Sequence, residues 1–281
     1  MGESPINFRL RILIAIVAAF AALAPVCVLA GGSTATKPTE KFELSNGAHV
    51  EVIGENAEVR VHGVTTDTLE LTVTLNNAEF VDYFTQSFGG DPASHLVISA
   101  NVSAGGTTTA NSVIEIGIPA GIELTIRTTN RAISVDAVSI STAILATSNG
   151  KITVANSSGD FDLNTTNSEV TVQGVDGPVN IVTTNASVWF EGVVDEGSNS
   201  ISTTNGDIAV RLKNGSNVAV SGNTRNGDVT VNGGSDGVAR DGDRASISYR
   251  VDIGVATLHL TNGPGAIHVN PPVIAVFDGE S

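Results

Sequence analysis

Paired carboxylates are the residues of this sequence whose types and spacing could do chemistry. Two carboxylates on neighbouring strands can serve as acid and base in polysaccharide cleavage, or can bind Ca²⁺. Three pairs have a suitable spacing or position, namely Asp160 with Asp162, Asp241 with Asp243, and Asp207 with Asp228. The last pair occupies one position of a recurring phrase, so stacked copies of that phrase would bring its carboxylates close together.

The rest of that position argues against a designed acidic cluster. Other copies of the phrase carry Ala132, Lys151, Glu169 and Ser187 there. Such a mixture is typical of a solvated edge, so we expect no enzyme, no catalytic residue, and no cofactor or metal ion. A polysaccharide-binding or polysaccharide-cleaving β-helix that uses these acids is the alternative.

Histidine and cysteine add little to the candidate chemistry. The five histidines show no metal-ligand spacing and are expected to be isolated surface residues: His49, His62, His95, His259 and His268. Cys27 is the only cysteine and lies in an apolar N-terminal stretch. Neither a nucleophile elbow nor a phosphate-binding loop is present in the sequence.

Trp189 is the one aromatic residue that suggests a binding surface. It is the only Trp, and its strand phase points outward between Val188 and Phe190. An exposed aromatic ring often contacts a sugar or a protein partner. The alternative is that another segment covers it, such as residues 77–92, which we expect to form a short helix or packed loop capping the core.

A repeat of 18 to 21 residues organises the elements that must position these side chains. "ISTTNGDIAV" is one copy, and each copy turns at an Asn: Asn130, Asn149, Asn167, Asn185, Asn205 and Asn226. The positions four before, three after and five after each Asn are apolar in nearly every copy, with Gly222 as the exception. A looser copy around Asn262 lies two periods further on, with "ASISYRV" between.

These columns predict an all-β fold, because residues two apart on a strand share a face. One repeat cannot bury its apolar face alone, whereas stacked repeats can, at about 4.8 Å per strand. We therefore expect a β-solenoid of two-strand rungs, capped by the N-terminal strands. A column of Thr two before each Asn should point inward and satisfy backbone groups beside the turn.

A chain of hairpins is the alternative fold, since Asn-Gly is a strong hairpin signal. Its turn needs a left-handed conformation at both residues, yet the second is Arg131, Ser168 or Ala186 in three copies. The constant Asn favours one left-handed residue per turn instead.

The layout of residues 112–135, "SVIEIGIPAGIELTIRTTNRAISV", followed by the Asn copies, resembles the putative adhesin family of bacterial and archaeal β-strand-repeat domains, which are largely uncharacterised. The resemblance covers about residues 42–270. It implies a secreted or surface-attached, solenoid-like domain and supplies no catalytic residue.

Composition limits the partners. The formal net charge is −15, which repels nucleic acids and anionic lipids, and no run of basic residues reverses it locally. We expect no nucleic-acid partner, and a surface glycan or protein instead. Aromatic residues make up only 4% of the chain, which disfavours an extended aromatic sugar groove.

The N-terminus predicts export. Arg9 and Arg11 precede an apolar run over 12–30 that ends in small residues, as in a secretory signal cleaved before Gly31. An uncleaved membrane anchor, as in an envelope sensory module, is the alternative. We thus expect a signal peptide (1–30), a polar spacer (31–41), one repeat domain (42–270, clearest over 122–231) and a tail (271–281), in a secreted or cell-envelope adhesion or structural module.

Overall fold

The computed structural model describes residues 33–103, 109–231, 237–252 and 254–271. Contacts divide the chain into Met1–Gly31 and Gly32–Ser281, and the described fold belongs to the second unit. The predicted signal segment, residues 1–30, lies outside the described residues. Among the described residues no helix has the length and apolar character needed to cross a membrane.

The described unit is all-β, a mixed 23-stranded sheet with one 3-10 turn, η1 (Ala78–Phe80). The strands are β1 (Thr34–Thr36), β2 (Glu40–Gly54), β3 (Ala57–Gly63), β4 (Thr68–Asn76), β5 (Val81–Phe88), β6 (Ala93–Val102), β7 (Asn111–Ile118), β8 (Glu123–Thr128), β9 (Ile133–Asp136), β10 (Ser139–Thr147), β11 (Ile152–Ala155), β12 (Ser158–Thr165), β13 (Val170–Asp176), β14 (Val179–Thr183), β15 (Val188–Val193), β16 (Ser198–Thr203), β17 (Ile208–Leu212), β18 (Val218–Arg225), β19 (Val229–Val231), β20 (Val238–Asp241), β21 (Arg244–Arg250), β22 (Ala256–Asn262) and β23 (Ile267–Asn270).

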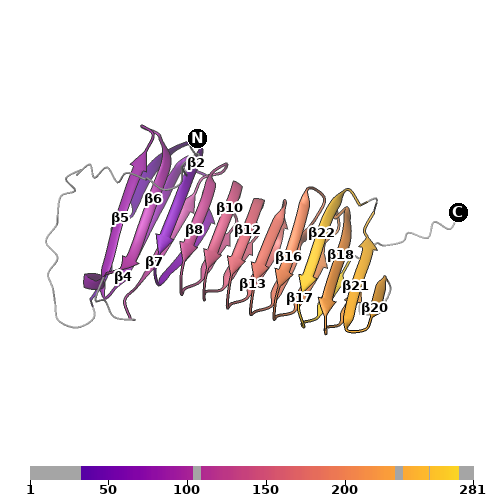
Figure 1. The fold of residues 1–281 in the computed structure, drawn as a ribbon. Helices are drawn as coiled ribbons and strands as arrows, with labels where there is room; N and C mark the ends of the chain where they lie inside the picture. The colour runs from indigo at the N-terminus through magenta and orange to yellow at the C-terminus, as the bar shows by residue number, and fades with distance from the viewer. Residues whose placement is uncertain (1–32, 104–108, 232–236, 253, 272–281) are drawn as a thin grey trace, which may run out of the picture. The chain divides into compact units, whose positions relative to one another are not determined.

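Strand pairing arranges the sheet as two long ladders (Figure 1). The first ladder runs β5–β6–β2–β8–β10–β12–β14–β16–β22–β18–β21–β20. The second runs β1–β4–β7–β3–β9–β11–β13–β15–β17–β23–β19. Each Asn copy contributes its first strand to one ladder and its second strand to the other.

Successive repeats pair in parallel and in register. Leu145 lies opposite Leu163, Leu163 opposite Ile181, and Ile181 opposite Ile201. The strands that flank each Asn pair with neighbouring repeats rather than with each other, so the hairpin alternative is wrong for these copies. Like residues therefore stack over like residues along each ladder.

The three apolar columns form the core, as the repeat predicts. Their members are at most 4% exposed, from Ile126 through to Val231. Gly222 breaks the pattern because β21 packs across it: a Cβ there would lie 2.9 Å from Ile247 Cγ2 and 3.0 Å from Leu260 Cβ. Ile247 thus fills the space that the missing side chain leaves.

The order of the last repeats differs from the sequence order. β22 pairs with β16 on one side and β18 on the other, and β23 likewise lies between β17 and β19. Figure 1 shows β22 between β16 and β18. The prediction that the Asn262 copy stacks two periods beyond Asn226 is therefore wrong: it inserts before Asn226, and β21 adds antiparallel outside β18.

The register also reassigns Asn262. It lies opposite Thr203, in the Thr column, and Ile267 lies opposite Ile208. Counting from that pair, Pro264 occupies the place of the turn Asn in this repeat. The Asn of "LTNG" therefore does not correspond to the Asn of "TTNG" but to the Thr two residues before it.

Antiparallel strands close the N-terminal end of the strand order. Residues 34–36, within the expected spacer, form β1 against β4. The sequence predicts a helix or packed loop over residues 77–92, but half of them, residues 81–88, form β5 against β6, and only residues 78–80 form the short turn η1. Alternating residues of β5 are only partly covered, and Phe84 is 51% exposed. β2 and β3, although first among the long strands, lie inside and pair with β8 and β9.

Candidate functional site

A chain of side-chain amides follows the Asn turns. Asn205 donates to Asn185, Asn185 to Asn167, and so on through Asn149 and Asn130 to Asn56, with all but the last bond at 2.7–2.8 Å. Each interior member gives one hydrogen bond and accepts one. We call this row the amide ladder. It ends at Asn205, because the next repeat carries Pro264 in that place.

The amide ladder explains why Asn recurs at the turns, and it replaces the explanation by a left-handed backbone conformation that the sequence suggested. Of the six turn residues only Asn226 has a positive φ, 61°, so a left-handed position does not explain the other five. Those five Asn residues each supply a donor N–H and an acceptor C=O on two different atoms of one planar amide, whereas an ionised Asp can only accept. The stacking of identical repeats lets each amide reach the next.

The Thr column behaves as predicted. Each of its six hydroxyls donates to a backbone carbonyl of a neighbouring repeat: Thr128, Thr147, Thr165, Thr183, Thr203 and Thr224. All six are at most 8% exposed. Asn262 replaces Thr in this column, and its amide donates to Gly206 O at 2.8 Å and Ala266 O at 3.1 Å. Its Oδ1 is buried without a partner.

The acidic pair Asp207 and Asp228 does not come together. Because β23 inserts between β17 and β19, Ala266 lies between them, and the prediction that they are near neighbours is wrong. Asp207 instead accepts the backbone N–H of Ala266 at 2.8 Å, and Asp228 pairs with Arg240 at 2.7 Å. Each carboxylate therefore has a local structural partner.

Asp160 and Asp162 do share a face of β12, and both line a hollow of about 170 Å³. That volume is below the ~300–1,000 Å³ usual for ligand pockets. Asp162 accepts a long hydrogen bond from Asn180, 3.4 Å. Asp241 and Asp243 lie at the turn between β20 and β21, also exposed.

Four of the five histidines are partnered rather than isolated, contrary to the sequence prediction, whereas His62 is exposed as predicted. His49 and His95 stack with ring centroids 5.0 Å apart, and Phe88 stacks on His95. His259 shares a 2.6 Å hydrogen bond with Ser221, and His268 shares a 2.7 Å bond with Thr230. In the described part of the chain, no three His, Cys, Asp or Glu side chains are grouped as a metal site.

Trp189 lies on the outer face of β15 and is 40% exposed. Its cross-strand neighbours are Thr171 and Ala209. The small Ala209 leaves one side of the indole ring uncrowded. Trp189 thus lies on the second ladder, and its side chain is accessible to a partner.

The outward side chains of β16, β22, β18 and β21 form a different kind of surface, which we call the hydroxyl face. These four adjacent strands contain no Asp or Glu, in a chain with 29 acidic residues. The outward positions are Ser198, Ser200, Ser202, Thr257, His259, Thr261, Ala219, Ser221, Asn223, Arg225, Arg244, Ser246, Ser248 and Arg250.

A cavity of about 910 Å³ opens at one side of the hydroxyl face. Arg225 and Arg244, directly opposite each other in the β18–β21 register, line it together with Arg240. Asp241 is the one acidic residue among the described residues that line it. The expectation that no basic cluster forms is therefore wrong: the arginines are dispersed in the sequence, and strand pairing gathers them.

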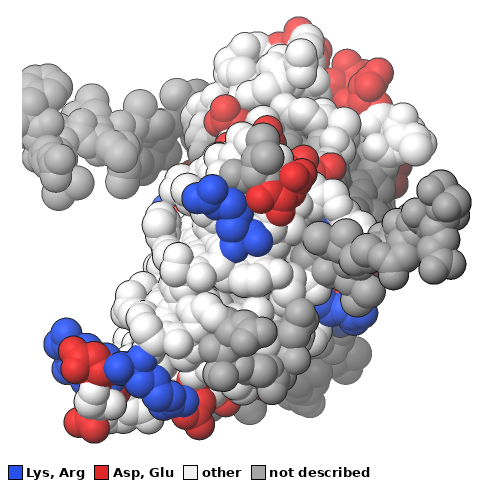
Figure 2. Space-filling view, turned by 90° about the vertical axis from the view of Figure 1, so that its right-hand side faces the viewer, with Lys and Arg blue, Asp and Glu red and all other residues white. Residues whose placement is uncertain are grey.

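A second hollow, of about 320 Å³, lies further along the same strands. Its lining includes Ser221, Ser248, His259 and Arg250. Figure 2, which faces the β20 and β21 end of Figure 1, shows basic groups next to acidic groups in two places, with largely uncharged surface between those two places. Hydroxyls, an imidazole and arginines thus line two neighbouring hollows on one face.

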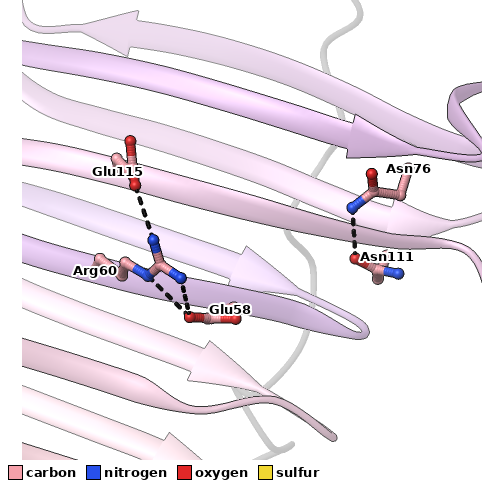
Figure 3. A network of polar contacts seen from close by, with 5 residues as sticks. All are labelled: Glu58, Arg60, Asn76, Asn111 and Glu115. Carbon is pink, nitrogen blue, oxygen red and sulfur yellow. Dashed lines mark hydrogen bonds and ion pairs between the residues drawn. The ribbon is translucent and has the colours of Figure 1, made fainter. Parts of the chain in front are cut away.

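Three of the described arginines have carboxylate partners, namely Arg60, Arg211 and Arg240. Arg60 lies between Glu58 and Glu115, with ion pairs of 2.7 and 3.0 Å (Figure 3). The hydrogen bond to Glu58 further raises the pKa of the Arg60 guanidinium. Nearby, Asn76 donates to Asn111 at 2.9 Å, which joins β4 to β7 (Figure 3).

The hydroxyl face is a candidate functional surface that sequence reasoning missed. The sequence does contain a hint of this surface, because four strand segments have no Asp or Glu. Those segments are not consecutive in the chain, so the sequence alone does not show that they form one face. Only the insertion of β22 between β16 and β18 brings them side by side. Such a face can offer hydrogen-bond donors and acceptors together with positive charge.

No family model matches the chain, and no curated protein matches it. Among solved structures, it is similar to a "putative cell adhesion protein" from Clostridium sporogenes, with 11% identity, 86% of this chain and 100% of that chain covered, and a TM-score of 0.35. It is also similar to a "putative adhesin" from Parabacteroides distasonis (10% identity, 86% and 98% covered, TM-score 0.37). A third, from the same organism, is described as a "putative lipid binding protein" (10% identity, 85% and 97% covered, TM-score 0.35). Proteins described as adhesins are thus among the solved structures to which this chain is similar.

Proposed function

We propose that this chain is a secreted or cell-surface, non-enzymatic adhesion or structural module, and that its described unit is a β-solenoid. The hydroxyl face is the observation that carries the proposal. A surface of hydroxyls without carboxylates, on a chain of net charge −15, suits contact with a polar partner.

The scaffold supports the same proposal. Parallel register, the amide ladder and the Thr column fix each repeat onto the next, so the outward side chains are held at strand spacing. Rigid elements position binding side chains more closely than loops do. The six turn Asn residues are structural in this proposal, and Trp189 is a separate contact candidate on the second ladder.

The test is adhesion of cells that display the full chain to immobilised surface glycans and surface proteins. We expect cells with the chain to adhere more strongly than cells without it. A Ser246→Asp/Ser248→Asp variant, which puts acids on the hydroxyl face, should lose adhesion. The matched control Ser134→Asp/Thr153→Asp adds the same charge on the second ladder and should retain it; equal loss in both would contradict the proposal.

A Trp189→Ala variant in the same assay separates the two contact candidates. If adhesion is lost with Trp189→Ala but retained with the hydroxyl-face variant, the contact with the partner lies on the second ladder. N-terminal sequencing of the exported protein tests localisation, and we expect a mature chain that begins at Gly31.

A further inference from the structure

We propose that the hydroxyl face binds a carboxylate-bearing saccharide, and that Arg225 and Arg244 hold its carboxylate. The inference rests on the proposed function and names the ligand class of that surface.

The arginine pair is the first argument. Arg225 and Arg244 are directly opposite neighbours on antiparallel strands, and both are exposed. Like charges in such a pair destabilise the sheet. Asp241 faces Arg244 from β20, yet no ion pair within 4.0 Å joins it to either arginine in the described structure. A ligand carboxylate between the two guanidinium groups would relieve the repulsion and accept charge-assisted hydrogen bonds.

The contrast with other arginines strengthens this argument. Arg60 has two carboxylate partners, Arg211 pairs with Glu191 at 3.5 Å, and Arg240 pairs with Asp228 at 2.7 Å. Arg127, Arg131 and Arg250 also have no ion pair in the described structure, but none of them has an arginine as its directly opposite partner on a neighbouring strand. The Arg225–Arg244 pair alone among the described arginines places two guanidinium groups opposite each other, where an external anion can bind both.

The lining of the cavity points to a sugar as the carrier of that anion. Beside the arginines lie Ser202, Asn223, Ser246 and Thr261, whose side chains can both donate and accept hydrogen bonds. Saccharide hydroxyls need such two-way partners. The volume of about 910 Å³ is at the upper end of usual ligand pockets, enough for more than one sugar ring.

Other anions fit less well. The 910 Å³ cavity has no aromatic lining residue on which a nucleic-acid base could stack, and the acidic chain repels dense polyanions. Among the described lining residues the apolar side chains are only the small ones of Ala239, Ala245 and Pro264, whereas peptide recognition uses deeper apolar pockets. A saccharide that carries its carboxylates on hydroxyl-bearing sugar rings matches both the arginine pair and the hydroxyls around it.

The experiment is titration calorimetry of the full chain with a galacturonate oligosaccharide and with its fully methyl-esterified form, which keeps the ring but removes the charge. We expect the acid form to bind at least about tenfold more tightly, because charge-assisted bonds are stronger than neutral ones. Inorganic phosphate and a polyglutamate peptide serve as competing anions. Equal or tighter binding of either would overturn the saccharide assignment.

Arg225→Gln/Arg244→Gln is the test variant, and Arg211→Gln is the control that removes a charge from the second ladder. We expect the test variant to lose at least about tenfold in affinity and the control to change less than about twofold. Without ligand, the test variant should melt no lower than the wild type, since it removes repulsion. A lower melting temperature would assign the arginines a structural role and overturn the proposal.

Failure of this inference is distinguishable from failure of the proposed function. If hydroxyl-face-dependent adhesion persists but galacturonate does not bind, the ligand class is wrong and the adhesion role stands. If galacturonate binds through the arginine pair but no display assay shows adhesion, the ligand assignment stands and the adhesion role is wrong.

Discussion

Asn185 donates its side-chain amide to Asn167 at 2.7 Å, although 18 residues separate them in the chain. Asn167 passes the same bond on to Asn149, also at 2.7 Å. Each interior Asn thus carries two side-chain bonds that its own repeat cannot supply. The amide ladder adds to the backbone hydrogen bonds that already join neighbouring turns, such as Asn185 N–H to Thr166 O at 2.9 Å.

The amide ladder predicts that Asn167→Asp destabilises the described unit. Asp keeps the acceptor for Asn185 but loses the donor to Asn149, and places two oxygens against each other. We expect a loss of about 1–2 kcal/mol, as for a broken hydrogen bond with an unmatched polar group. Thermal unfolding followed by circular dichroism measures it. Asn226→Asp is the control: Asn226 lies outside the ladder, and Asp tolerates its positive φ. Similar losses in both variants would contradict the prediction.

The unpartnered oxygen of Asn262 predicts a substitution that does not destabilise. Asn262→Thr restores the residue of its column, keeps a donor toward Gly206 O, and removes a buried oxygen without a partner. An unsatisfied buried group costs about 1–3 kcal/mol, so we expect unchanged or higher stability in denaturant unfolding. Thr203→Val is the contrast. This change leaves the carbonyl of Ala186 and the N–H of Gly206 without their hydrogen-bond partner. We expect it to lower the free energy of unfolding by about 1–3 kcal/mol.

Tyr83 predicts a loss of stability at alkaline pH. Burial and the nearby carboxylate of Glu40, which accepts its hydrogen bond at 3.2 Å, raise the pKa of the Tyr83 phenol. Below the ordinary Tyr pKa of about 10 the phenol is neutral in both states, and stability is unaffected. Above it the unfolded chain releases the proton while the native chain retains it, so stability falls as pH rises.

Absorbance at 295 nm checks this prediction in a Tyr249→Phe variant, where Tyr83 is the only phenol. We expect no ionisation of the native protein until well above pH 10. A further Tyr83→Phe change should remove its contribution to the alkaline loss of stability. Native ionisation close to pH 10 would show that Tyr83 is not held in its buried contact.

The fluorescence of Trp189 can report which ladder a ligand contacts. It is the only Trp, and β15 belongs to the second ladder, whereas the hydroxyl face belongs to the first. Binding of a galacturonate oligosaccharide to the hydroxyl face should therefore leave Trp fluorescence unchanged. A protein partner that contacts Trp189 should shift its emission. A shift with the oligosaccharide would mean that the sugar reaches β15 instead.

Local periodicity was enough to predict the strands, the apolar columns and the inward Thr column, because each depends on alternation within one repeat. Ile208 and Val210 illustrate this: both are buried, with Ala209 between them partly exposed. The conformation of the turn was not predictable in the same way. Asn recurs at the turns because its side chain bonds to the Asn of an adjacent repeat, as Asn205 does to Asn185 of the preceding repeat. That contact lies outside any single turn.

Pairing order was the part that the sequence could not reveal. The spacing from Asn226 to Asn262 is compatible with continued stacking, and nothing in the intervening residues marks an insertion. The hydroxyl face and the Arg225–Arg244 pair depend on that order, so the candidate site was missed together with it. Trp189, whose exposure depends only on strand phase, was located correctly on an outer face.

The place of β22 and β23 has a consequence for how the protein assembles during synthesis or export. Repeats from β8 to β17 can add one after another as the chain emerges, each onto an edge already present. The next strands to emerge, β18 and β19, have their permanent neighbours in residues that come later. β18 and β19 therefore cannot make their final pairings until β22 and β23 have been synthesised and have inserted between them and β16 and β17. Completion of this end is thus a single closing event with long-range contacts, which are slow to form. A chain cut short before Ala256 would expose the unpaired edges of β16 and β17, the kind of edge that recruits other strands.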